Sequence, residues 1–199
     1  MSRRRSAPAS NPAAADLLAA PAGALSALGA EWYIFGAQAT LIWGRPRLTA
    51  DVDVTVRLEP ENPDRLVAAL EAAGFRLRVS ASDDFVRRTR VLPFVFRPSE
   101  LPLDVVLAGP GLEELFLSRA VPVRVGSVTV PVISPEDLIV TKILAGRSKD
   151  LDDIAGVLGE RLSQLDLESI RATLRILEEA LAQNGLLPVF DRELARVQR

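Results

Sequence analysis

Cysteine and histidine are both absent from this sequence of 199 residues. The lack of cysteine excludes disulfide bonds and thiolate metal sites. The lack of histidine excludes Ser-His-Asp and Cys-His catalysis, histidine-ligated zinc and histidine as a general base. If the chain is an enzyme, carboxylates, lysine or arginine must carry the chemistry, together with a metal ion that prefers oxygen ligands.

Long apolar runs are also missing, so we expect no transmembrane helix and no association with a membrane. The arginines at residues 3–5 resemble the start of an export signal, but Pro12, Asp16 and Pro21 interrupt the segment that would follow. We therefore expect a cytoplasmic protein. The net charge is −2, so nucleic-acid binding would require a local basic patch rather than a globally positive surface.

The pattern along the chain predicts three segments. Residues 1–22 are rich in alanine, proline and arginine, and we expect a disordered tail with at most a weak helix from Asp16 to Leu28. Residues 23–133 alternate short β-forming runs with amphipathic helices, and residues 134–199 have a helical pattern. We therefore expect an α/β (α+β) fold, in which helices pack on a small mixed β-sheet and a helical segment follows at the C-terminus.

Two local patterns make more specific structural predictions. The strand predicted for residues 91–96 contains Pro93, and we expect it at the edge of the sheet because proline has no backbone N–H. Ser134 and Pro135 are typical of a helix N-terminus, and Gly146 predicts the end of that helix.

The segment from Glu31 to Arg57 carries the strongest functional pattern. It ends in a β-forming run in which Asp51 and Asp53 are two residues apart. Residues two apart in a strand point to the same face, so these carboxylates share one side with Thr55 and the intervening valines form a core face. Like charges on one face of a sheet are destabilising, and a magnesium ion with oxygen ligands would offset that repulsion.

Other residues around this pattern fit a phosphate-binding site. Gly36 and Ala37 lie between a predicted strand and a predicted helix, where small residues let the backbone approach a ligand and helix amides bind phosphate. A further aspartate, Asp104, stands among apolar residues in the strand predicted for residues 101–107. Three carboxylates at one edge of a sheet would hold two magnesium ions, as in polymerase-type sites.

The combined pattern resembles the nucleotidyltransferase superfamily that includes DNA polymerase β. The motif of that superfamily has a glycine followed by Gly or Ser, then an acidic pair of the form [DE]-h-[DE]-h, then a distal h-[DE]-h. The corresponding segments here are Gly36-Ala37, Asp51-Val52-Asp53-Val54 and Leu103-Asp104-Val105. More narrowly, GRPRLTADVDV followed by ISPEDLIVTKILAGRSKDLDDI is similar to the minimal nucleotidyltransferases of the AbiEii/MenT toxin type.

The resemblance implies transfer of a nucleoside monophosphate from an NTP to a hydroxyl group, with Mg²⁺ as the cofactor and Mn²⁺ as a possible substitute. Both metal ions would be bound by Asp51 and Asp53, and one of them by Asp104 as well. The acceptor would be a tRNA 3′ end or a protein side chain, and an antitoxin protein would be a partner. The nucleotide-binding residues implied by the resemblance are Gly36, Ala37, Arg45, Arg47, Thr49, Lys142, Lys149 and Asp150.

Some of these residues also have purely structural interpretations, which the sequence leaves open. Ala37 replaces the usual Gly or Ser, so the alternative to an enzyme is a catalytically weak or inactive nucleotide- or protein-binding module of the same fold. Asp104 could pair with an arginine, and Lys142 could extend its charge from an amphipathic helix into solvent. Asp150 could cap the following helix, with Asp153 closing the capping box.

The arginine clusters are similarly open to two interpretations. Arg45 and Arg47 could neutralise phosphate charge or could simply be solvated in a loop. Arg87, Arg88 and Arg90 could be solvated or could contact an RNA backbone.

Overall fold

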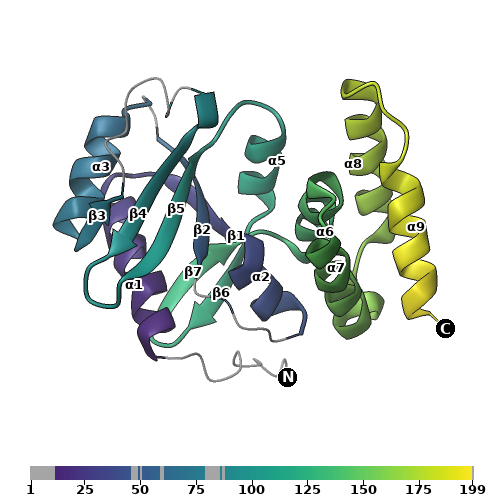
Figure 1. The fold of residues 1–199 in the computed structure, drawn as a ribbon, viewed down its shortest axis with the longest axis horizontal. Helices are drawn as coiled ribbons and strands as arrows, with labels where there is room; N and C mark the ends of the chain where they lie inside the picture. Colours follow the sequence, from purple (N-terminus) through teal and green to yellow (C-terminus); the bar gives the residue numbers. More distant parts are fainter. Residues whose placement is uncertain are drawn as a thin grey trace. The chain divides into compact units, whose positions relative to one another are not determined.

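Figure 1 shows the computed structural model, which describes residues 12–45, 49, 51–58, 61–78, 86 and 88–198. The chain folds into two compact units. Unit 1 comprises Met1–Gln38 and Thr49–Ile133, and unit 2 comprises Ala39–Leu48 and Ser134–Arg199. Within the described residues, no helix combines the length and the apolar character that crossing a membrane requires.

A mixed sheet forms the centre of unit 1. Among the described residues its strands are β1 (Glu31–Phe35), β2 (Val52–Arg57), β3 (Phe75–Leu77), β4 (Val91–Phe96), β5 (Leu101–Leu107), β6 (Val121–Val125) and β7 (Val128–Val132). They lie in the order β3-β4-β5-β2-β1-β7-β6. Strand β1 is parallel to β7 and β2 is parallel to β5, whereas the other neighbours are antiparallel.

Helices cover this sheet within unit 1. They are α1 (Pro12–Ala27), α3 (Pro63–Ala72) and α5 (Leu112–Arg119), and α2 (Gly36–Trp43) begins in unit 1 directly after β1. Helix α1 packs against α3, β1 and β7 and lies behind the sheet in the view of Figure 1. Helix α5 packs against β1, where the rings of Phe116 and Tyr33 meet edge to face with centroids 6.5 Å apart.

The alternation of side chains along the strands gives the sheet a buried face and a more open face. Val52, Val54 and Val56 of β2 are at most 1% exposed, and their register partners on β5 are buried leucine and valine residues. Asp53 and Asp104 lie on the opposite, more open face, where both are half-buried. The predicted core face of this strand is therefore confirmed.

The predicted edge position of the strand that contains Pro93 is wrong. Strand β4 lies between β3 and β5, so it is an interior strand. The carbonyl of Pro93 accepts a hydrogen bond from the N–H of Arg78 at 2.8 Å, just beyond the end of β3. The nitrogen and the carbonyl of one strand residue point to the same neighbouring strand. The nitrogen of Pro93 therefore faces the end of β3, so its missing N–H removes no hydrogen bond between β4 and β5.

The N-terminal helix begins earlier than the sequence pattern predicts. Helix α1 runs from Pro12 to Ala27 and so includes part of the segment expected to be a tail, while residues 1–11 lie outside the described residues. Leu17 and Leu25 of α1 are fully buried. Tertiary packing therefore stabilises a helix that contains Pro21, which local propensity alone would not support.

Unit 2 consists of helices, which confirms the predicted α/β fold class with a C-terminal helical segment. They are α6 (Pro135–Ala145), α7 (Ser148–Arg161), α8 (Leu167–Ala180) and α9 (Leu186–Val197), with a short 3₁₀ turn at Leu162–Gln164. Helix α6 packs against α7, α8 and α9. Its ends are as predicted: the Ser134 hydroxyl accepts from the N–H of Asp137 at 3.0 Å, and Gly146 closes the helix with φ of +64°.

The C-terminal part of α2 belongs to unit 2, where α7 holds it. The Arg161 guanidinium lies 4.8 Å from the centre of the Trp43 ring and donates hydrogen bonds to the carbonyls of Trp43 at 3.0 Å and Ile42 at 3.3 Å. These contacts satisfy carbonyl groups that the end of a helix leaves without intrahelical partners.

Candidate functional site

Two of the three predicted carboxylates are neighbours in the structure. Asp53 on β2 is the register partner of Asp104 on β5, and the two strands are parallel. Register partners point to the same face of a sheet, so both side chains lie on the open face of unit 1. Asp51 immediately precedes β2 and is exposed to solvent. The tertiary structure thus brings together two acids that are 51 positions apart in the sequence.

Gly36 lies against the carboxylate of Asp53. Its φ is +64°, in the left-handed region that favours glycine, and a Cβ atom built there would be 2.1 Å from Oδ2 of Asp53. The reason is the register of β1 and β2, because Phe35 is the partner of Asp53 and Gly36 follows it directly. The backbone at the start of α2 therefore touches a candidate metal ligand, a contact that no larger residue would allow.

We expect Gly36→Ala to be destabilising and to impair any function of the Asp53 carboxylate. The left-handed φ costs an alanine about 1–2 kcal/mol, and the clash with Oδ2 is expected to add about 1–3 kcal/mol because the carboxylate must move. Urea unfolding of the purified variant measures the total loss of unfolding free energy.

Gly29→Ala is the matched control for this prediction. Gly29 also has a left-handed φ, of +67°, but a Cβ atom there would have nothing within 4 Å. Its alanine variant should therefore lose only the conformational part, about 1–2 kcal/mol. Equal losses in the two variants would show that the close approach of Gly36 to Asp53 has no energetic consequence.

Gln38 is a residue of this site that the sequence reasoning missed. Its side chain is 6% exposed, and its Nε2 atom donates a hydrogen bond to the Asp51 carbonyl at 3.4 Å. The bond connects the first turn of α2 to the residue that precedes β2, so it helps to position the Asp51 backbone. The nearby residues Ala37 and Thr49 are half-buried, and their predicted contacts with a nucleotide stay predictions.

Asp104 forms an ion pair with Arg78, a second residue that no motif indicated. The guanidinium Nη2 donates to Oδ1 of Asp104, which matches the alternative in which this aspartate pairs with an arginine. Among the described residues, no group of three or more acidic side chains is arranged to hold a metal ion. In this structure Asp104 is oriented toward Arg78, and the three candidate carboxylates do not converge on one point.

The donor chemistry of the site nevertheless fits the magnesium ions that the resemblance implies. Asp53 and Asp104 are adjacent, Asp51 is two residues from Asp53, and carboxylate oxygens are the ligands that Mg²⁺ prefers. The lack of a side chain at Gly36 also leaves room for one of these carboxylates, that of Asp53, at the start of α2. Asp51, Asp53 and Asp104 are therefore the residues that would hold the metal.

Lys142 and Asp150 of unit 2 are buried together. Lys142 is 5% exposed, and its Nζ atom donates to Oδ1 of Asp150 at 3.0 Å and to Oδ2 of Asp153 at 2.6 Å. Asp150 also accepts from Nε of Arg147 at 2.6 Å. Burial raises the pKa of Asp150, but the hydrogen bonds from Arg147 and Lys142 outweigh it, so the net pKa lies below the ordinary value.

This network favours a structural role for Lys142, which neither extends into solvent nor has a free amine. Asp150 lies in the first turn of α7, whose N-cap is Arg147, so the alternative that Asp150 caps this helix is wrong. The predicted contacts of Lys142 and Asp150 with a nucleotide stay predictions.

Two other predicted nucleotide-binding residues of unit 2, Lys149 and Arg45, are accessible to solvent. Lys149 is exposed on α7. Arg45 is exposed and lies 3.6 Å from Glu160 in a solvated ion pair. Arg47 lies outside the described residues. Lys149 and Arg45 are therefore sterically available to an anionic ligand.

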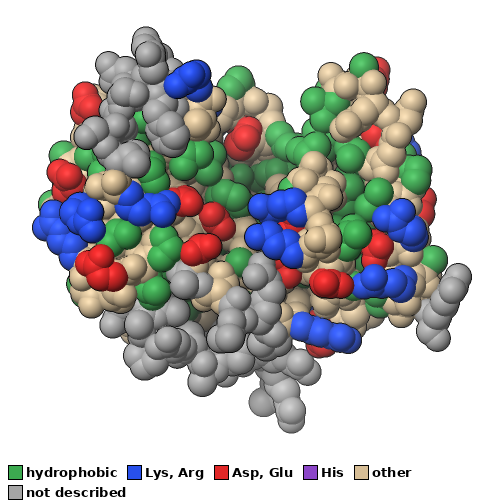
Figure 2. Space-filling model, viewed as in Figure 1, with side chains coloured by type: hydrophobic (Ala, Val, Ile, Leu, Met, Phe, Trp, Pro, Cys, Tyr) green, Lys and Arg blue, Asp and Glu red, His purple; other side chains and the backbone are tan. Residues whose placement is uncertain are grey.

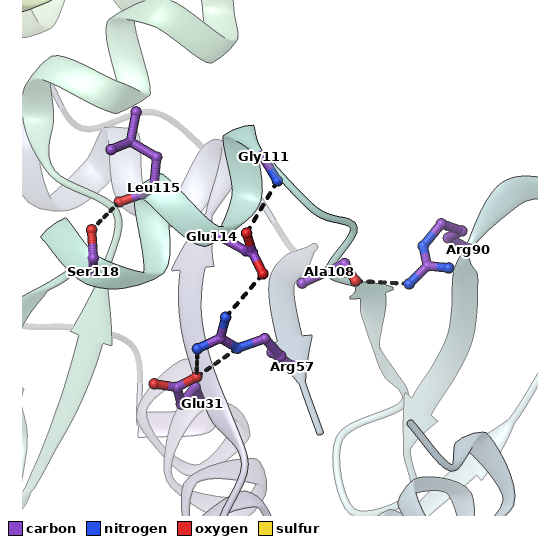
Figure 3. Close-up of polar contacts among 8 residues, drawn as sticks. All are labelled: Glu31, Arg57, Arg90, Ala108, Gly111, Glu114, Leu115 and Ser118. Atoms are coloured by element: carbon purple, nitrogen blue, oxygen red, sulfur yellow. Dashed lines mark hydrogen bonds and ion pairs between the residues drawn. The ribbon is translucent and has the colours of Figure 1, made fainter. Parts of the chain in front are cut away.

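A polar cluster at the C-terminal end of β2 connects three elements of unit 1. Arg57 forms ion pairs with Glu31 on β1 and with Glu114 on α5, the latter at 3.2 Å (Figure 3). Its hydrogen bond with Glu31 has the largest effect on the pKa of Arg57, which is raised above the ordinary value. The cluster thus holds α5 on the open face of the sheet.

Arg90 is also committed to structure rather than free to contact RNA. Its guanidinium donates to the carbonyls of Leu107 at 2.9 Å and Ala108 at 2.7 Å, the second of which Figure 3 shows. Arg88 is exposed, and Arg87 lies outside the described residues. On the face of unit 1 seen in Figure 2, acidic and basic side chains are interspersed among the coloured residues rather than gathered by sign.

Comparison with protein families identifies the family to which the chain belongs. The family described as nucleotidyltransferase of unknown function (DUF6036) matches residues 26–184, which include all three aspartates and the Lys142 network. The chain belongs to this nucleotidyltransferase family. The predicted membership of the nucleotidyltransferase superfamily is therefore confirmed, and the narrower AbiEii/MenT relationship stays a prediction.

Solved structures share the fold. A solution structure of the antibiotic-resistance factor ANT(2'')-Ia has a TM-score of 0.58 and 15% identity, covering 87% of this chain and 97% of its own. A crystal structure of ANT(2")-Ia in complex with adenylyl-2"-tobramycin has a TM-score of 0.56 and 17% identity, covering 82% and 97%. An antigenic nucleotidyltransferase-like protein from Paracoccidioides brasiliensis has a TM-score of 0.57 and 17% identity, covering 91% of each chain. The search of curated proteins found no match.

Proposed function

We propose that this chain is a divalent-metal-dependent nucleotidyltransferase that transfers a nucleoside monophosphate from an NTP to a hydroxyl acceptor. The observation that carries the proposal is the adjacent placement of Asp53 and Asp104 on parallel strands, with the backbone of Gly36 against the Asp53 carboxylate. Membership of a nucleotidyltransferase family supports it.

In the proposed reaction the acceptor oxygen forms a bond to the α-phosphorus, and the bond from that phosphorus to the oxygen of the leaving pyrophosphate breaks. Asp104 would orient the acceptor hydroxyl and accept its proton, the role that the resemblance to the superfamily implies for it. Mg²⁺ held by Asp51, Asp53 and Asp104 would neutralise charge on the phosphates. Gly36 lets the backbone at the start of α2 lie close to the Asp53 carboxylate, so the amides of that first turn would be available to the triphosphate.

The acceptor and the biological role are finer parts of the proposal. The AbiEii/MenT resemblance supports a tRNA 3′ end or a protein side chain as the acceptor, a toxin function and an antitoxin partner. The complex of ANT(2")-Ia with adenylyl-2"-tobramycin adds a small polyhydroxylated molecule as a further class of acceptor to test. Arg45, Arg47, Lys142 and Lys149 are the cations that would contribute to nucleotide binding under the same resemblance.

Label transfer tests the proposal directly. The protein is incubated with each α-labelled NTP and Mg²⁺ in the presence of total tRNA, of a protein extract, or of an aminoglycoside. We expect label on one of these acceptors, and we expect none with the Asp51→Ala/Asp53→Ala double variant. Equal transfer by the double variant would contradict the carboxylate site, and nucleotide binding without transfer to any acceptor would favour the inactive binding module.

A further inference from the structure

A row of residues crosses the open face of the sheet at the candidate site. Arg78 follows β3, and its N–H donates to the carbonyl of Pro93 on β4. Pro93 is the register partner of Asp104, and Asp104 is the register partner of Asp53. The row therefore runs from a guanidinium over a proline to the two carboxylates, with all side chains directed to the same face.

The Arg78 side chain spans the width of β4 to reach Asp104. Its guanidinium forms an ion pair with Oδ1 of Asp104, whose register partner on β4 is Pro93. The side chains of Arg78 and Asp104 are 40% and 36% exposed, so water and small ligands have access to the pair. Ion pairs of this exposure contribute little to stability and are readily exchanged for a stronger partner.

Arg78 and a divalent metal ion would compete for the carboxylate of Asp104. The oxygen that accepts from Arg78 belongs to one of the carboxylates that would bind a divalent cation, and two positive groups at one carboxylate repel each other. The described residues contain no ready three-carboxylate arrangement, which agrees with Asp104 being turned toward Arg78.

We propose that Arg78 is a built-in competitor of the metal at Asp104, and that a nucleoside triphosphate relieves this competition by offering the displaced guanidinium its phosphates. The inference rests on the proposed function and adds a nucleotide-binding residue to it. Its consequence is thermodynamic coupling: a metal ion alone binds weakly, whereas metal and nucleotide strengthen each other's binding. The arrangement also neutralises part of the carboxylate repulsion when no metal is bound.

Arg78→Gln tests the proposal through binding, without turnover. Titration with Mn²⁺ alone, followed by electron paramagnetic resonance, should show tighter binding by about two- to fivefold, the gain expected when a half-exposed cation is removed. Titration with α,β-methylene-ATP at saturating Mn²⁺ should show weaker binding by about tenfold, because a charge-assisted hydrogen bond to phosphate is lost. The two constants change in opposite directions, which general damage to the fold would not produce.

Arg76→Gln is the matched control. Arg76 is on β3, two residues before Arg78, and its guanidinium lies 3.7 Å from Glu100 rather than beside a site carboxylate. Both dissociation constants of this variant should stay within about twofold of the wild type. The proposal is overturned if Arg78→Gln leaves Mn²⁺ binding unchanged or weakens it, or if Arg76→Gln reproduces its effects.

Asp53→Asn separates failure of this inference from failure of the proposed function. If Mn²⁺ binds the wild type and binding is lost in Asp53→Asn, the metal site stands and the Arg78 result decides the inference alone. If Mn²⁺ does not bind the wild type with or without α,β-methylene-ATP, the metal-dependent function itself is contradicted, and the inference with it.

Discussion

Replacing Asp53 by asparagine is expected to lower the rate of nucleotidyl transfer by about a thousandfold, the magnitude typical of removing one electrostatic contact to a reacting group. Asparagine keeps the shape of the side chain and its place beside Gly36 but removes the charge that would hold a divalent cation. The rate of label transfer from the NTP identified in the acceptor screen, at saturating Mg²⁺, measures the effect.

The stability of this variant should change in a different way from its activity. Asp53 and Asp104 are adjacent carboxylates, so the loss of one charge reduces their repulsion, and the thermal unfolding midpoint without metal should fall by no more than about 4 °C. A rate that falls while stability is retained is the result expected of a functional carboxylate rather than of a structural one.

Asp64→Asn is the control with the same chemical change. Asp64 is exposed in the first turn of α3 and has no place in the candidate site, so its variant should transfer label at the rate of the wild type. Activity of Asp53→Asn within about tenfold of the wild type would contradict the role proposed for this carboxylate.

Replacing Lys142 by methionine is expected to lower the free energy of unfolding by about 3–5 kcal/mol, the range measured when one partner of a buried ion pair is removed. Methionine has a similar length, so little volume is lost, but Asp153 keeps a buried charge without its amine. Asp150 retains Arg147, which lies 2.6 Å from its Oδ2 atom. Urea denaturation followed by circular dichroism measures the loss.

Two further variants make this prediction specific. Lys149→Met removes the other lysine of the chain, which is exposed, and should change the unfolding free energy by less than about 0.5 kcal/mol. Adding Asp153→Asn to Lys142→Met should recover part of the loss, because one of the two buried carboxylate charges that faced the amine is then removed. A loss below about 1 kcal/mol in Lys142→Met would mean that the ion-pair network does not stabilise unit 2.

The sequence predicted the structure best where the signal is local. The alternation of aspartate and valine along β2 correctly assigned the buried face, because the side-chain period of a strand follows from backbone geometry alone. The ends of α6 were likewise predictable, since Ser134 and Gly146 satisfy or close the helix within one turn. The glycine after β1 was recognised as a place of close approach, although its contact with the Asp53 carboxylate was not.

Prediction was less successful where several segments act together. Pro93 suggested an edge strand, but the effect of its missing N–H depends on which neighbouring strand the nitrogen faces. That neighbour is β3, which ends beside Pro93, so the sheet can continue on the other side of β4. Pro21 and an alanine-rich composition suggested a tail, but buried leucines of α1 pack into unit 1. Arg78 belongs to no motif, and only the pairing of β3, β4 and β5 brings it to Asp104.

The sequence by itself determined the fold class, the buried face of β2, the ends of α6 and the supply of acids from which a metal site could be built. Those properties depend on residues a few positions apart, where the geometry of a strand or a helical turn is decisive. Only the tertiary structure decided that Asp53 and Asp104 are neighbours, that Arg78 pairs with Asp104, and that Lys142 is enclosed by two aspartates. Strand register and helix packing join segments far apart in the chain, and no local rule specifies which of them will meet.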